Sequence, residues 1–109
     1  MTKISIYKKG KNIVKYVVEG HSDFAEEGSD IVCSAISVVA YTTINGITDV
    51  LGIPVGYEVR DAYLECIVPD NLSDSEREKV SILLDTMYLS FVNLKEQYKE
   101  YITIIDMEV

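Results

Sequence analysis

The chain has 109 residues, of which 48% are hydrophobic, so we expect one domain over residues 1–109 with a real core and no room for a second domain. Its 10 lysines and arginines stand against 18 aspartates and glutamates, and this net charge of −8 argues against nucleic acid and anionic membranes and favours a basic partner or substrate. The N-terminus lacks the apolar core and small-residue cleavage site of a secretory signal, and no run approaches the ~18 apolar residues of a membrane span.

Residues 2–8 and 12–19 predict a β-hairpin. The first run alternates isoleucine with polar residues, and the second is rich in β-branched and aromatic residues. Gly10 lies between them, where a hairpin turn needs a residue that tolerates positive φ. Residues 20–29 hold two glycines and several acids, and this composition predicts an exposed, mobile loop.

A long helix is predicted to begin at Ser29 or Asp30, either of which can cap it, and to end near residues 51–52. Asn45-Gly46 alone would indicate a hairpin turn, but it lies inside an unbroken helical period. We interpret Gly46 as a helical glycine that lets another element approach closely. The period predicts one buried stripe on this helix: Val32, Ile36, Val39, Thr43, Ile47 and Val50.

Residues 55–60 and 62–68 predict a second hairpin that turns near residues 60–61. Alternation along its second strand places Leu64, Cys66 and Val68 on one face, and Tyr63, Glu65 and Ile67 on the other. We interpret Cys66 as a core residue.

A capping box formed by Ser73 and Glu76 predicts the start of a second long helix that reaches about Lys99. Besides its main apolar stripe (Val80, Leu83, Met87, Phe91, Leu94 and Tyr98), this helix has a second one at Ile82, Leu89 and Val92. The second stripe is equally compatible with a well-buried helix and with contact to another subunit. Residues 101–105 predict a last strand, and the order ββαββαβ predicts an α+β fold, in which two long helices pack on one mostly antiparallel sheet in two layers.

The strongest candidate for chemistry is Cys33 at the start of the first helix, with the only histidine, His21, on the loop before it. With Asp30 as N-cap, Cys33 would be the third helical residue, where free N–H groups and the helix dipole favour the thiolate. A protonated His21 could stabilise that thiolate and then give its proton to a leaving amine, while first-turn N–H groups hold the oxyanion. These parts make up a minimal cysteine protease dyad.

Each of these residues also has a purely structural interpretation. A cysteine in an apolar helix is usually a small core residue, and no general rule links a cysteine and a histidine twelve residues apart. Asp30 is expected to cap the helix first and to orient His21 only second. Ser37, one turn after Cys33, could line a pocket or bond a preceding carbonyl, and Ser34 is equally ambiguous. Neither a metal site nor a cofactor is expected, because one histidine and two cysteines without a CxxC pair offer no ligand set.

The stretch from Gly20 to Ser37 resembles the signature of the Prp family of bacterial ribosomal-processing cysteine proteases. That family has Gly-His at the start of a loop and then Asp-Ile-Val-Cys-Ala-Ala-Val-Ser at the start of a helix. This chain has Gly20-His21 and then Asp30-Ile31-Val32-Cys33-Ser34-Ala35-Ile36-Ser37. The similarity extends to the length, the leading hairpin, Asn45-Gly46 and the long second helix.

The resemblance implies that His21 and Cys33 are the catalytic pair and that Gly20, Asp30, Ser34 and Ser37 support them or bind substrate. It implies a cytoplasmic endopeptidase that removes the N-terminal extension of a large-subunit ribosomal protein precursor in ribosome biogenesis, and a homodimer formed through the second long helix. Ser22-Asp23 stand where the family has Ala-Gly, and an acid beside the histidine favours the protonated imidazole.

Two other classes of protein compete with this hypothesis. The first is a non-catalytic acidic module that docks on a basic ribosomal protein. A thiol redox protein is the weaker of the two, because no second cysteine lies near Cys33 in the sequence.

Overall fold

The structure is a computed structural model that describes residues 1–20 and 29–109, and the side chains of those residues other than 29 and 30. The expected loop over residues 20–29 therefore lies outside the described residues except at its two ends. The elements follow the predicted order: β1 (Thr2–Lys9), β2 (Asn12–Glu19), α1 (Ser29–Asn45), η1 (Gly46–Val50), β3 (Gly56–Arg60), β4 (Tyr63–Ile67), α2 (Asp74–Gln97) and β5 (Ile102–Glu108).

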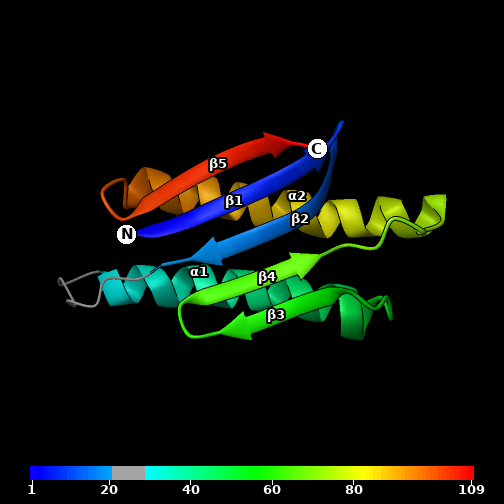
Figure 1. Ribbon diagram of the computed structural model, residues 1–109, viewed down its shortest axis with the longest axis horizontal. Helices are drawn as coiled ribbons and strands as arrows, with labels where there is room; N and C mark the ends of the chain where they lie inside the picture. The colour runs from blue at the N-terminus through cyan, green and yellow to red at the C-terminus, as the bar shows by residue number, and fades with distance from the viewer. Residues whose placement is uncertain (21–28) are drawn as a thin grey trace.

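The five strands form one sheet in the order β3-β4-β2-β1-β5. Neighbouring strands are antiparallel except β1 and β5, which are parallel and pair Thr2 with Ile102. Both helices cover the same face of this sheet, as Figure 1 shows, with α1 behind β4 and β3 and α2 behind β1 and β2. The expected α+β fold with two layers is thereby confirmed.

The core lies between the sheet and the two helices. Alternate side chains along β1 (Ile4 and Ile6), β2 (Tyr16 and Val18) and β4 are buried there, because alternate residues of a strand point to the same face. Leu64, Cys66 and Val68 are among them, as the alternation predicted. Tyr16 is fully buried and donates its hydroxyl hydrogen to the carbonyl oxygen of Ala40 at 2.9 Å, which ties β2 to α1.

Gly46 allows the two helices to approach each other. A Cβ at this position would lie 3.1 Å from Cδ1 of Leu83 on α2, so the interpretation of Gly46 as a close-approach glycine is confirmed. From Gly46 to Val50 the chain forms a π-helical turn. This wider turn changes which residues face inward. Val50 was predicted to be buried and is 81% exposed, and Leu51 packs against the core instead.

Helix α2 begins with the predicted capping box, in which Ser73 and Glu76 bond reciprocally through side chain and backbone. Its inward stripe includes Leu84, which is buried, whereas Leu83 packs beside Gly46. Two residues of the second stripe are largely uncovered by the described part of the chain, whereas Val92 is half-buried. Ile82 is 62% exposed and Leu89 is 61% exposed.

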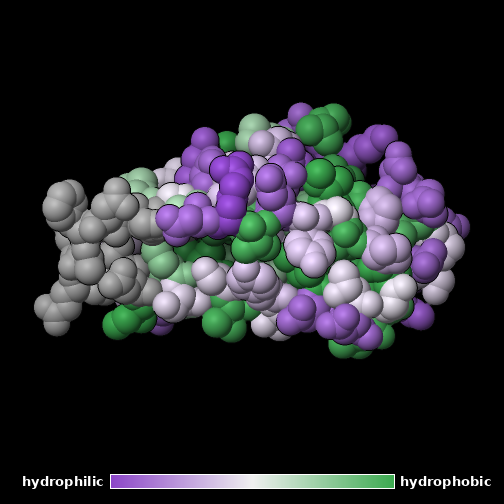
Figure 2. Space-filling model, turned by 60° about the horizontal axis from the view of Figure 1, so that its bottom comes forward, coloured by the Kyte–Doolittle hydropathy of each residue, from purple (hydrophilic) through white to green (hydrophobic). Residues whose placement is uncertain are grey.

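One segment passes the length and composition test for a membrane span, contrary to the expectation that none would. Residues 31–50 form a helical run of 20 residues with a mean hydropathy of 1.5 over its most apolar window. The inward side of this run packs on the sheet and on α2, which is the placement of a core helix. Figure 2 shows hydrophobic residues scattered among hydrophilic ones on the side of the molecule that it presents.

Candidate active site

Cys33 lies at the N-terminal end of α1 with its side chain half-buried. The assignment of Asp30 to the N-cap implied that Cys33 is the third residue of the helix. Because α1 already begins at Ser29, Cys33 is its fifth residue. Helical side chains lean toward the N-terminus, so the sulfur of a fifth residue still lies over the first turn. The N–H groups of that turn have no acceptors within the helix.

The sulfur of Cys33 is in contact with the first residue of strand β1. Its Sγ lies 3.2 Å from Oγ1 of Thr2, within hydrogen-bond distance for a sulfur atom. Thr2 is buried, with 3% of its surface exposed. This contact joins two residues that are 31 positions apart in the sequence, and it fixes where the thiol lies relative to the sheet.

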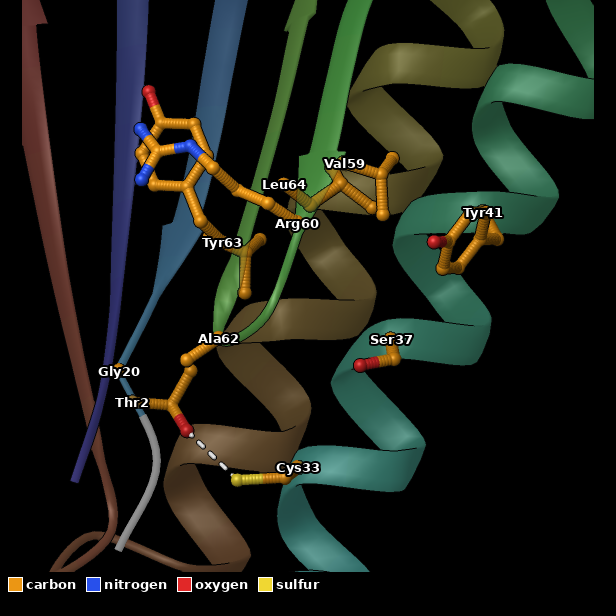
Figure 3. A pocket seen from close by; sticks show the side chains of 11 residues that line it. Thr2, Gly20, Cys33, Ser37, Tyr41, Val59, Arg60, Ala62, Tyr63 and Leu64 are labelled. Atoms are coloured by element: carbon orange, nitrogen blue, oxygen red, sulfur yellow. Dashed lines mark hydrogen bonds between the residues drawn. The ribbon is translucent and has the colours of Figure 1, made fainter.

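Cys33 opens into a pocket of about 200 Å³ between α1 and the β3–β4 hairpin. Figure 3 shows Cys33 and Thr2 at one end, with Ser37 and Tyr41 following at successive turns of α1. The opposite wall comes from the β3–β4 hairpin. The pocket is lined by Thr2, Val18, Gly20, Cys33, Ser37, Tyr41, Val59, Arg60, Ala62, Tyr63 and Leu64. The pocket is large enough for one or two side chains of a peptide.

A second pocket continues the first along α1. It has a volume of about 310 Å³ and shares Tyr41 with the first pocket. Asn45, Thr48 and Asp49 line its helix side, and Tyr57 of β3 lines its sheet side. Strand β3 is the edge of the sheet, so the two pockets together follow a free strand edge.

The turn of the β3–β4 hairpin holds the start of the segment that carries His21. The N–H of Gly20 donates to the carbonyl oxygen of Ala62 at 2.9 Å. Ala62 has a φ of 58°, which is uncommon for a residue other than glycine. Gly20 itself has a φ of +88°, and a Cβ there would lie 2.8 Å from the carbonyl oxygen of Met1. Gly20 is therefore required both by its backbone conformation and by the close approach of β1.

The charged groups at the hairpin side of the pocket are paired with each other. The guanidinium of Arg60 lies 3.9 Å from the ring centre of Tyr63, and its Nε is 3.7 Å from a carboxylate oxygen of Glu58. Tyr63 donates its hydroxyl hydrogen to Glu65 at 2.8 Å, and this hydrogen bond raises the pKa of Tyr63. Figure 3 shows the Arg60 side chain beside the Tyr63 ring and far from Cys33.

The structure brings Gly20, Cys33 and Ser37 together in the lining of one pocket. Ser34 is exposed and is not part of the pocket lining. His21 lies outside the described residues, and the side chain of Asp30 is not described either. Among the residues whose side chains are described, no three histidine, cysteine, aspartate or glutamate residues form a group that could hold a metal ion.

The second thiol is chemically different from the first. Cys66 is fully buried in the core, as predicted, and burial raises its pKa to about 11. It therefore stays protonated at neutral pH, and a protonated thiol is a poor nucleophile. Both cysteines are free.

Sequence reasoning missed most of the pocket wall. Tyr41 could have been found, because residues 33, 37 and 41 recur at a spacing of one helical turn. Thr2 and the hairpin residues gave no such signal, since their proximity to Cys33 depends on the order of strands in the sheet.

The chain matches known proteins over nearly its whole length. The family model of the cysteine protease Prp matches residues 1–103. The ribosomal processing cysteine protease Prp of Bacillus subtilis is 28% identical over 94 residues, which cover 83% of this chain and 82% of the relative. The protein of that name from Staphylococcus aureus is 26% identical over 101 residues, or 91% of each chain.

The crystal structure of the protease Prp from S. aureus in complex with a substrate peptide has the same fold. It superposes with a TM-score of 0.84 at 22% identity, and the match covers 97% of this chain and 99% of the other. At this level of identity the likeness concerns the arrangement of the strands and helices.

Proposed function

The chain belongs to the family of the cysteine protease Prp, and from this we propose that it removes the N-terminal extension of a large-subunit ribosomal protein precursor. As a member of that family the chain is a cysteine protease. The relatives from B. subtilis and S. aureus are named as ribosomal processing enzymes, and this supports the choice of substrate.

One observation carries the assignment of the nucleophile: the thiol of Cys33 is half-buried, lies at a helix N-terminus and opens into a peptide-sized pocket. In the proposed reaction its thiolate attacks the carbonyl carbon of the scissile bond, and N–H groups at the helix start stabilise the oxyanion. His21, as imidazolium, gives its proton to the departing amine, which leaves a thioester. Water then adds to the thioester with His21 as base, and the acid product and free thiol are released.

The supporting residues have smaller roles in this proposal. Gly20 sets the start of the segment that carries His21, through its hydrogen bond to Ala62. Asp30 lies in the first turn of the helix, where we propose that it helps to orient His21. Ser37 contacts substrate from the wall of the pocket, and Ser34, which is exposed, contacts it outside the pocket.

An extended, basic peptide suits the net charge of the chain and the shape of this site. The net charge of −8 attracts a basic ribosomal protein and repels the phosphates of nucleic acid. The two joined pockets between α1 and the free edge of β3 offer an extended path for the peptide. We place the enzyme in the cytoplasm, where ribosomal proteins are made.

The exposed stripe of α2 is the proposed contact between two copies of the chain. Ile82 and Leu89 are each more than half exposed, and Val92 of the same stripe is half-buried. Two such stripes packed together would remove these apolar side chains from water. The homodimer formed in this way leaves the pocket at Cys33 open, because the pocket lies between α1 and β3.

Cleavage of a peptide that copies the precursor junction tests this function. We expect the wild-type chain to cleave it and the variants Cys33→Ala and His21→Ala to be at least 10³-fold slower, since each removes one half of the dyad. Cys66→Ala is the matched control, because Cys66 is buried in the core, and it should cleave at close to the wild-type rate. Cleavage by Cys33→Ala would refute the nucleophile. A wild-type chain that binds the peptide without cleaving it would favour the non-catalytic docking module.

A further inference from the structure

The hydroxyl of Thr2 is a polar group that contacts the sulfur of Cys33. Thr2 Oγ1 and Cys33 Sγ are 3.2 Å apart, and Thr2 is 97% buried, since only 3% of its surface is exposed. Thr2 is the first residue of β1, and Figure 3 shows its side chain directed at the sulfur. The hydroxyl can accept a hydrogen bond from a thiol or donate one to a thiolate.

We propose that Thr2 is a positioning residue that donates a hydrogen bond to the Cys33 thiolate and holds it ready to attack. The proposal rests on the role of Cys33 as the nucleophile. A hydrogen bond from a neutral donor to an anion is stronger than one that involves a neutral S–H group. The Thr2 hydroxyl therefore stabilises the thiolate more than the thiol, and it increases the share of the reactive form.

The backbone around Thr2 is fixed on both sides, so the hydroxyl is held in place before substrate arrives. The N–H of Thr2 donates to the carbonyl oxygen of Tyr101 at 2.8 Å, next to the pairing of Thr2 with Ile102. On the other side, the carbonyl of Met1 lies against Gly20 so closely that a Cβ would be 2.8 Å away. Threonine is also β-branched, which restricts rotation of its side chain.

The hydrogen bond is strongest in the state that attacks and is lost as the reaction proceeds. When the sulfur forms its bond to the carbonyl carbon, it gives up its negative charge and becomes a weak acceptor. Thr2 therefore favours the thiolate before attack and contributes little to holding the thioester. At neutral pH, removing the hydroxyl should slow the attack of Cys33 on any electrophile, including a small reagent that does not use the peptide-binding groove.

Alkylation by iodoacetamide isolates this step, because the sulfur displaces iodide and no substrate peptide is needed. Peptide mapping by mass spectrometry separates Cys33 from Cys66, whose buried thiol serves as the slow internal reference. The other titratable groups that line the pocket are Tyr41, Arg60 and Tyr63, with Glu58 and Glu65 bound to the last two, and they stay unchanged in every variant. His21 is likewise kept.

Thr2→Val has nearly the same shape as threonine but lacks the hydroxyl. We expect alkylation of Cys33 in Thr2→Val to be on the order of tenfold slower than in the wild type at pH 7. At a pH high enough to ionise this thiol in both proteins, the two rates should be equal or the variant slightly faster, since a less stabilised thiolate is more nucleophilic. A purely structural loss would lower the rate at both pH values.

Thr2→Ser and Thr2→Ala form the second comparison, in which both lose the methyl group and only serine keeps the hydroxyl. Thr2→Ser should keep most of the wild-type alkylation rate at pH 7, and Thr2→Ala should not. This comparison tests the role of the hydroxyl even if Thr2→Val does not fold. Equal pH profiles for the wild type and Thr2→Val, or equal rates for the serine and alanine variants, would overturn the proposal. If these results hold while the wild type fails to cleave the precursor peptide, the proposed substrate is wrong and the role of Thr2 stands.

Discussion

Replacement of Gly20 by alanine tests how tightly the chain is held beside the site. Gly20 has a φ of +88°, and an added Cβ would lie 2.8 Å from the carbonyl oxygen of Met1. That oxygen is backbone, so it cannot move aside as the end of a flexible side chain could. Gly20→Ala must therefore either strain the backbone at this position or push the first residues of β1 away from Gly20.

The expected cost has two parts. A non-glycine residue at positive φ loses roughly 1–2 kcal/mol. Overcrowding of a close contact adds about 1–3 kcal/mol, so Gly20→Ala should lower the free energy of unfolding by about 2–5 kcal/mol. Since the displaced residue precedes Thr2, the variant should also weaken the contact between Thr2 and Cys33 and slow alkylation of Cys33 at pH 7.

Gly10→Ala is the matched control for the first part of this cost. Gly10 also has a positive φ, +62°, but nothing lies within 4 Å of its would-be Cβ. Its replacement should cost only the roughly 1–2 kcal/mol of backbone strain and should leave alkylation of Cys33 unchanged. Guanidinium unfolding at pH 7, followed by circular dichroism, measures both variants. Equal losses of stability for Gly20→Ala and Gly10→Ala would refute the inferred contact between Gly20 and Met1.

Two further predictions concern stability at alkaline pH and assembly. Burial raises the pKa of Cys66 to about 11 and also raises that of Tyr16, so the folded chain keeps protons that the unfolded chain releases above about pH 9. This contribution to the free energy of unfolding should be fully present below pH 9 and should be lost as the pH rises toward 11. In guanidinium unfolding, the stability of Cys66→Ala should fall less steeply over this range than that of the wild type. An equally steep fall would contradict the raised pKa of Cys66. In sedimentation experiments the wild type should be a dimer and Ile82→Glu and Leu89→Glu monomers, whereas Val38→Glu, on the exposed side of α1, should leave the dimer intact. A monomeric wild type at tens of micromolar would contradict the proposed role of α2.

Local patterns in the sequence determined most of the secondary structure. The alternation in residues 62–68, the capping box at Ser73 and Glu76, and the close-approach glycine at Gly46 all depend on residues a few positions apart, so they could be predicted before any fold was known. The exposure of Val50 could not be predicted, because the π-helical turn after Asn45 changes which residue faces the core.

The sequence by itself also determined where chemistry was to be expected, because a cysteine at a helix start and the only histidine lie in one short stretch. The surroundings of Cys33 were decided by the tertiary structure. Thr2 reaches the sulfur from β1, and the opposite wall of the pocket comes from the β3–β4 hairpin, so three segments meet that the sequence keeps apart. The order of the strands depends on the packing of the whole sheet and its helices. It therefore cannot be predicted from the spacing of residues within one segment.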